Sequence, residues 1–145
     1  MQNISEPTTL VFSINTEVGS VEKSLTFYPD TYLIQVDINT KNVSSEMFAG
    51  QYFFSWKGGL PLTEKNITDD LMYTNAFLFQ GGELEKVKAD GPNFLESDYN
   101  GLTDWVSTRT KYFTASFVPT EDTKPKSTII GSGLVEDQEI YDLSL

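Results

Sequence analysis

Residues 101–119 read GLTDWVSTRTKYFTASFVP, and this stretch decides the fold expected for the whole chain. Both of its halves are strand-like, and the second half alternates strictly, so that Phe113, Ala115 and Phe117 share one face of an extended strand. Pro119 ends the run because it removes a donor from the sheet ladder. A strand this apolar would promote aggregation at an exposed sheet edge. We therefore expect it to lie centrally, as a core strand of a β-sandwich.

The size and charge of the chain limit the classes of function. A length of 145 residues is that of one domain, so we expect residues 1–145 to form a single domain. The 21 acidic residues against 10 basic ones give a net charge of −11. Such a balance disfavours binding to nucleic acid or to an anionic membrane surface, because both need clustered basic side chains.

Two residue types are missing from the sequence. Without Cys there is neither a disulfide framework nor a thiolate zinc site, and without His the commonest general base and metal ligand is absent. We therefore predict a protein that is not an enzyme and that holds neither a cofactor nor a metal ion. The sequence shows no signal peptide and no run apolar enough to span a membrane, and its strand pattern begins so early that it reads as cut from a longer chain.

Alternating apolar and polar residues, separated by Gly, Pro and Asn turns, predict further strands. They fall at residues 10–14, 21–28, 32–40, 51–56, 73–80, 84–88, 94–99, 127–130 and 138–143. The first three form a meander. Residues 63–71 alone have helical character, with Asn66 or Thr68 as the cap of a single turn. About ten strands with regular turn signals indicate an all-β fold, a twisted two-sheet antiparallel β-sandwich.

Aromatic side chains offer one candidate binding surface. Tyr52, Trp56 and Trp105 either form a platform for sugar rings or extended peptides, or simply pack in the core. Near the turn at residues 58–61, acidic side chains would line the same cleft: Glu64, Asp69 and Asp70.

Two further groups of residues have a functional and a structural interpretation. Arg109 and Lys111 either bind an anion or lay their aliphatic stems over apolar surface. Gly131 and Gly133 begin like a dinucleotide-binding loop, but the third glycine and the following helix are missing, so a bulge or turn is favoured.

Residues 101–119 also resemble a strand pair of the large periplasmic domain of YidC membrane-protein insertases, in which a Gly- and Trp-containing strand leads into a Lys-Tyr-Phe-x-Ala-x-hydrophobic-Pro strand. Residues 25–42 are similar to that family's Phe-rich strand, turn and second strand ending in Asn. Residues 56–66, WKGGLPLTEKN, look like a third segment of the family. Together the three segments follow the family's order over most of residues 10–135.

The resemblance implies a β-supersandwich, a fold shared with sugar mutarotases, on the periplasmic face of the bacterial inner membrane. The parent protein would be an integral membrane protein that inserts other membrane proteins. This chain would be part of its soluble domain, incomplete at both ends, and would bind Sec translocon accessory subunits or nascent membrane proteins without catalysis. The possible cleft or partner-binding residues are Tyr52, Trp56, Glu64, Arg109 and Lys111.

Two alternatives remain open. The shared fold allows a carbohydrate-binding or mutarotase-like module, although mutarotase chemistry usually needs a His that this chain lacks. The other alternative is a structural module whose exposed strand edges pair with a partner.

Overall fold

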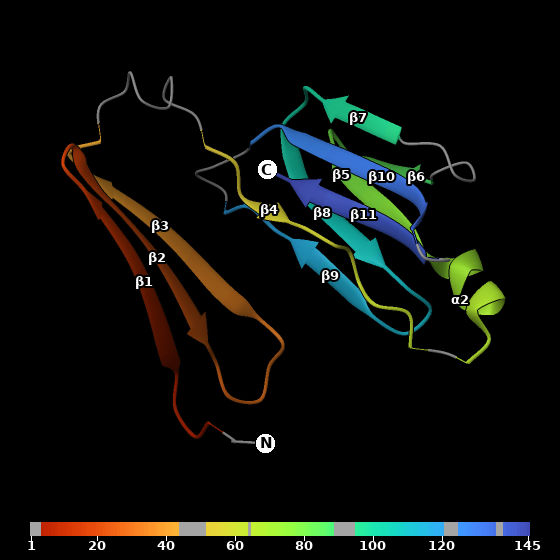
Figure 1. The fold of residues 1–145 in the computed structure, drawn as a ribbon, viewed down its shortest axis with the longest axis horizontal. Helices are drawn as coiled ribbons and strands as arrows, with labels where there is room; N and C mark the ends of the chain where they lie inside the picture. The colour runs from red at the N-terminus through yellow and green to blue at the C-terminus, as the bar shows by residue number, and fades with distance from the viewer. Residues whose placement is uncertain (1–3, 44–51, 64, 89–94, 121–124, 136–137) are drawn as a thin grey trace. The chain divides into compact units, whose positions relative to one another are not determined.

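The computed structural model describes residues 4–43, 52–63, 65–88, 95–120, 125–135 and 138–145, which form antiparallel strands and one short helix (Figure 1). The all-β class expected from the sequence is confirmed. The chain divides into two compact units, Met1–Tyr52 and Phe53–Leu145. A single domain over residues 1–145 stays a prediction.

The first unit is a three-stranded antiparallel meander. It contains β1 (Thr8–Thr16), β2 (Gly19–Phe27) and β3 (Ile34–Lys41), in the order β1-β2-β3 (Figure 1). Leu10 pairs with Leu25, which in turn pairs with Val36 of the third strand. The predicted meander is thus confirmed. The third strand begins later than expected, and Tyr32 before it is fully exposed.

The second unit is a sandwich of two four-stranded sheets. One sheet has the order β4-β11-β10-β7, with β4 (Ser55–Trp56), β7 (Leu95–Tyr99), β10 (Ser127–Val135) and β11 (Gln138–Ser144). The other has the order β6-β5-β8-β9, with β5 (Asn75–Gln80), β6 (Glu83–Val87), β8 (Thr103–Arg109) and β9 (Thr114–Phe117). Buried side chains from both sheets form one apolar cluster: Ala76, Leu78, Val87, Val106, Ile129, Tyr141 and Leu143. This shared core holds the two sheets face to face.

A short helix, α2 (Ile67–Tyr73), leads into β5. Of the two caps expected, Asn66 and Thr68, the structure has Asn66, whose side chain accepts a hydrogen bond from the main-chain N–H of Asp69 at 3.3 Å. The sequence predicted only a single turn here, and a helix of seven residues is too short to be stable alone. Tertiary contacts therefore stabilise it, chiefly those of the fully buried Asp70.

The central position predicted for the second half of residues 101–119 is wrong. The central strand is β8, whereas β9 lies at the edge of its sheet. Phe113 keeps 55% of its surface exposed, while Phe117 packs against the core and meets the ring of Phe54, with the two ring centroids 4.7 Å apart. This edge strand is short, because β9 has only four residues and Pro119 follows it. A short edge ending in Pro offers few free main-chain groups to another chain, so it limits aggregation even though the strand is not central.

Two strand boundaries also differ from the sequence prediction. The strand expected at residues 127–130 continues through both glycines to Val135, and its register with β11 shifts between Ser132 and Val135, where a bulge was one of the expected outcomes. The strand expected at residues 51–56 is regular only over Ser55–Trp56, and residue 51 lies outside the described part.

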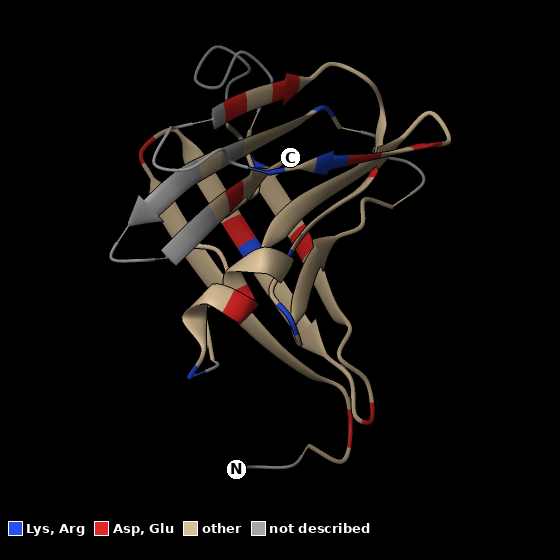
Figure 2. Cartoon of the chain, turned by 90° about the vertical axis from the view of Figure 1, so that its right-hand side faces the viewer, with Lys and Arg blue, Asp and Glu red and all other residues tan. Residues whose placement is uncertain are grey.

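Neither a membrane-spanning helix nor a metal cluster is found in the described ranges. No helix there is long and apolar enough to cross a membrane. The same ranges contain no group of three or more His, Cys, Asp or Glu side chains that could hold a metal ion. Acidic positions are scattered over strands, helix and turns (red in Figure 2).

Candidate binding groove

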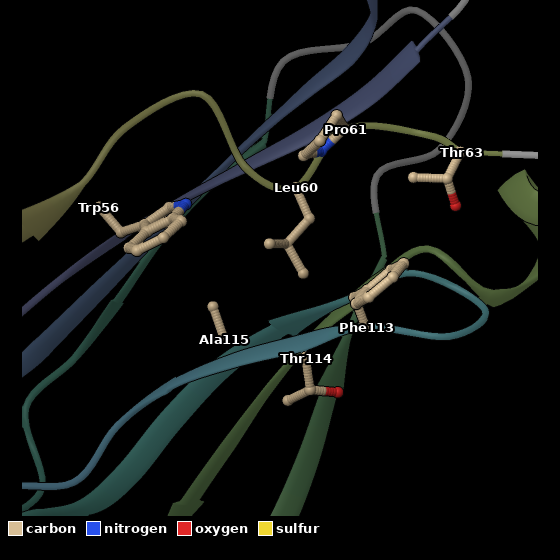
Figure 3. A pocket seen from close by; sticks show the side chains of 7 residues that line it. All are labelled: Trp56, Leu60, Pro61, Thr63, Phe113, Thr114 and Ala115. Carbon is tan, nitrogen blue, oxygen red and sulfur yellow. The ribbon is translucent and has the colours of Figure 1, made fainter. Parts of the chain in front are cut away.

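The second unit has an apolar groove between the connection from β4 to α2 and the start of β9. Its volume is about 360 Å³ (Figure 3). No charged side chain lines it, and its lining residues are Trp56, Leu60, Pro61, Thr63, Phe113, Thr114 and Ala115. A concave, mostly apolar surface of this size is typical of a site that binds a ligand or a few side chains of a partner.

The first wall of the groove is the connection that follows β4, and hydrogen bonds fix its path. The indole N–H of Trp56 donates to the carbonyl oxygen of Gly59 at 2.7 Å, and the N–H of Gly58 donates to Asp142 at 2.8 Å. Gly58 and Gly59 both adopt positive φ, 83° and 57°, which other residues rarely do. Lys57 pairs with the same Asp142 at 3.3 Å. This wall is therefore preformed.

The second wall begins at the turn between β8 and β9. The N–H of Thr110 donates to the carbonyl oxygen of Phe113 at 2.9 Å and closes the turn. The Asp70 carboxylate accepts from the N–H of Lys111 at 3.0 Å and, through its other oxygen, from the N–H of Thr63 at 3.3 Å. Since Thr63 belongs to one wall and the 110–113 turn leads into the other, Asp70 ties α2 to both sides of the groove.

Lys111 is engaged within the protein. Its ammonium group forms an ion pair with the Asp69 carboxylate and lies over the rings of Tyr73 and Tyr112, 5.9 Å and 5.3 Å from their centroids. The hydrogen bond to Asp69 raises the pKa of Lys111; desolvation opposes this, and the interaction with Tyr112 adds to the rise. Lys111 thus keeps its charge but directs it at Asp69.

The structure places the sequence-predicted site residues in different surroundings. Trp56 lines the groove, and Lys111 lies in the turn of the second wall. Arg109 lies on β8 over the ring of Phe77, 6.0 Å from its centroid. Tyr52 is 60% exposed and belongs to the first unit. Glu64 lies outside the described residues.

The proposed aromatic platform is not assembled as one surface. Trp105 stacks on Phe79 of the neighbouring strand, with ring centroids 5.9 Å apart and planes 11° from parallel, whereas Trp56 lines the groove. Sequence reasoning missed the contribution of Leu60 and Phe113 to a common site. The Gly-Gly-Leu-Pro turn was noted beside a cleft, but no local pattern shows that it meets residues more than fifty positions later.

The fold and the groove together define an all-β sandwich module with a preformed apolar groove at its side. Residues 1–140 match the family model of the YidC periplasmic domain. The chain therefore belongs to the YidC periplasmic-domain family of the membrane-protein insertases, as its sequence resemblance predicted.

Individual relatives agree with this assignment. The chain is 38% identical over 106 residues to the membrane protein insertase YidC of Chlorobium luteolum, an alignment covering 72% of this chain and 18% of the relative. It is 36% identical over 100 residues to the YidC of Prosthecochloris aestuarii, covering 68% and 17%. The matched part of this chain thus spans less than a fifth of the length of these two relatives. No solved structure gives a significant match.

Proposed function

We propose that this chain works as the periplasmic domain of a membrane-protein insertase at the bacterial inner membrane, and that it assists insertion by binding a partner, without catalysis. Membership of the YidC periplasmic-domain family supports this location and a part in membrane-protein insertion. The sequence supports a binding role, because it contains neither His nor Cys and so lacks the commonest acid–base and nucleophilic groups.

The groove is the observation on which the binding role depends. Its walls are fixed by hydrogen bonds before any partner arrives, so little conformational entropy is lost on binding. Its lining is apolar and uncharged, which favours apolar side chains over charged ones. Of the two partner classes, newly made membrane proteins fit this chemistry better than a folded Sec accessory subunit. A groove for a few side chains implies transient binding, with a Kd of about 1 μM to 1 mM.

Photocrosslinking in the natural protein tests this proposal. A photoreactive amino acid is placed at Phe113, in the groove, or at Leu84, on the opposite edge strand of the same sheet; the two side chains are 55% and 59% exposed. Light is applied while a membrane protein is being synthesised. We expect crosslinks to that membrane protein, or to Sec subunits, from position 113 and few from position 84. Equal yields from both positions, or none from either, would contradict a role for the groove.

A carbohydrate-binding role is the second candidate, and the position of Trp56 in the groove favours it. Replacing Trp105 with Phe leaves Trp56 as the single tryptophan reporter. Titration with simple sugars should then change the emission of Trp56 if a sugar binds there. An unchanged emission at millimolar sugar would reject this candidate.

A further inference from the structure

The outer edge of β9 presents main-chain groups that no described residue of the second unit pairs with. In an antiparallel pair, every second residue directs its N–H and C=O at the neighbouring strand. Because Thr110 bonds to Phe113 and the register pairs Thr108 with Ala115, the main-chain groups of Phe113 and Ala115 face β8. Those of Thr114 and Ser116 therefore point away from the sheet. Within the described part of the second unit, no backbone hydrogen bond reaches this edge.

This free edge borders the apolar groove. Thr114 and Ala115 belong both to β9 and to the groove lining (Figure 3). The opposite wall, with Leu60 and Pro61, faces them across the groove (Figure 3). A strand added to the edge would place its side chains alternately on the two sides of the sheet, so every second one would enter the groove.

We propose that β9 binds an extended segment of another polypeptide as an added strand, and that this segment has apolar residues at alternate positions and basic residues at its ends. This proposal deepens the binding function proposed above and depends on it. Hydrogen bonds from Thr114 and Ser116 hold the main chain of the segment, and the groove selects its apolar side chains.

Charge determines the flanking residues of the segment. The chain has a net charge of −11, which attracts basic flanks and makes association depend on salt. The nearby lysines do not repel such flanks strongly, because Lys57 pairs with Asp142 and Lys111 pairs with Asp69. The same net charge disfavours a second copy of this chain as the occupant, since two β9 edges would bring two acidic molecules together.

A synthetic peptide tests the proposal directly. The probe alternates Val and Thr and carries lysines at both ends; the control peptide has the same sequence with N-methylated amides on every second residue, in both possible registers. Binding is followed by Trp56 emission in the Trp105→Phe chain, and amide hydrogen exchange is measured at Thr114 and Ser116. We expect saturable binding of the probe, slower exchange at both amides, and little binding of the methylated peptides.

Two substitutions at position 116 distinguish the contribution of the main-chain N–H to peptide binding from that of the side chain. Ser116→Pro removes an N–H that points away from β8, so the sheet loses no hydrogen bond, whereas Ser116→Ala keeps that N–H. We expect Ser116→Pro to weaken peptide binding by about tenfold and Ser116→Ala by less than about twofold. Equal affinities of the two variants, or binding without slower exchange at Thr114 and Ser116, would overturn strand addition.

The two proposals fail in different ways. Crosslinks from position 113 in the natural protein, together with no binding of the alternating peptide, would preserve the binding function and reject strand addition. Self-association of the free chain that Ser116→Pro abolishes would assign the edge to a second copy and would also reject the proposed occupant.

Discussion

Removing the Asp70 carboxylate should loosen the groove and destabilise the second unit. Asp70 is fully buried and accepts main-chain hydrogen bonds from Thr63 and Lys111, at 3.3 Å and 3.0 Å. Asp70→Ala leaves both donors without this acceptor. No other described contact joins α2 to both walls of the groove in this way. The substitution therefore tests whether the positions of the two walls depend on this one side chain.

The expected decrease in the free energy of unfolding follows from three contributions. A hydrogen bond to a charged acceptor stabilises a protein by about 1.5–3 kcal/mol, so two would give about 3–6 kcal/mol. The bond to Thr63 is long, and relief of the desolvation of a buried carboxylate offsets part of the loss. We therefore expect Asp70→Ala to lower the free energy of unfolding by about 2–3 kcal/mol. Asp70→Asn should cost about 1–2 kcal/mol, because Asn keeps one acceptor oxygen but turns an NH₂ group toward the other donor.

Urea unfolding followed by tryptophan fluorescence measures this loss in the right part of the chain, since Trp56 and Trp105 both lie in the second unit. The matched control is Thr68→Ala, an exposed position on the same helix, which should change stability by less than about 0.5 kcal/mol. The reasoning is refuted if Asp70→Ala unfolds at the same urea concentration as Thr68→Ala.

Three other predictions concern the core, the edge strand and the ion pair, and the first two use the same urea unfolding assay. Leu78→Ala, at a fully buried core position, should cost about 2–5 kcal/mol, whereas Leu84→Ala, on the neighbouring strand at an exposed position, should cost less than about 0.5 kcal/mol; equal losses would contradict the burial pattern. Phe117→Ala should cost about 3 kcal/mol, because its ring packs against the core, and Phe113→Ala less than about 1 kcal/mol; similar losses would restore a central position for β9. Because folding raises the pKa of Lys111, its stabilising contribution is complete below the unfolded value of about 10.4 and is lost as the pH rises through the folded value. The difference in unfolding free energy between the natural chain and Lys111→Met should therefore stay constant up to about pH 10 and shrink as the pH rises above that value, and a difference that does not shrink above about pH 10 would argue against this pair.

Patterns in the sequence correctly predicted the elements that are determined by residues close together in the chain. Strict alternation predicted the hairpin of β1 and β2, because one face of each strand is apolar. Asn66, one of the two caps expected from the sequence, marks the start of α2, because a cap acts within three residues. The family resemblance rested on residues 101–119 and was confirmed by the match over residues 1–140.

The same patterns failed where position in a sheet decides the outcome. The apolar alternation around Phe113 indicated a strand but not whether one or two neighbours flank it, and the structure puts it at an edge. Likewise, Leu60 and Phe113 line one groove although they are distant in sequence, and Asp70 ties together the two segments that carry them. Periodicity describes one strand at a time and contains no information about such pairings.

The pairing of β4 with β11 has a consequence for the order in which the molecule assembles. Trp56 pairs with Leu143, Phe54 exchanges two hydrogen bonds with Leu145, and the hydroxyls of Ser55 and Ser144 meet across 89 positions of sequence. The sheet β6-β5-β8-β9 can form once residue 117 has been synthesised, but β4, the first strand of the second unit, must wait for its partner β11. Because Trp56 belongs to one wall of the groove, the groove is completed only after β11 has been synthesised, and a chain interrupted before residue 143 would present the β9 edge with only half of its binding site.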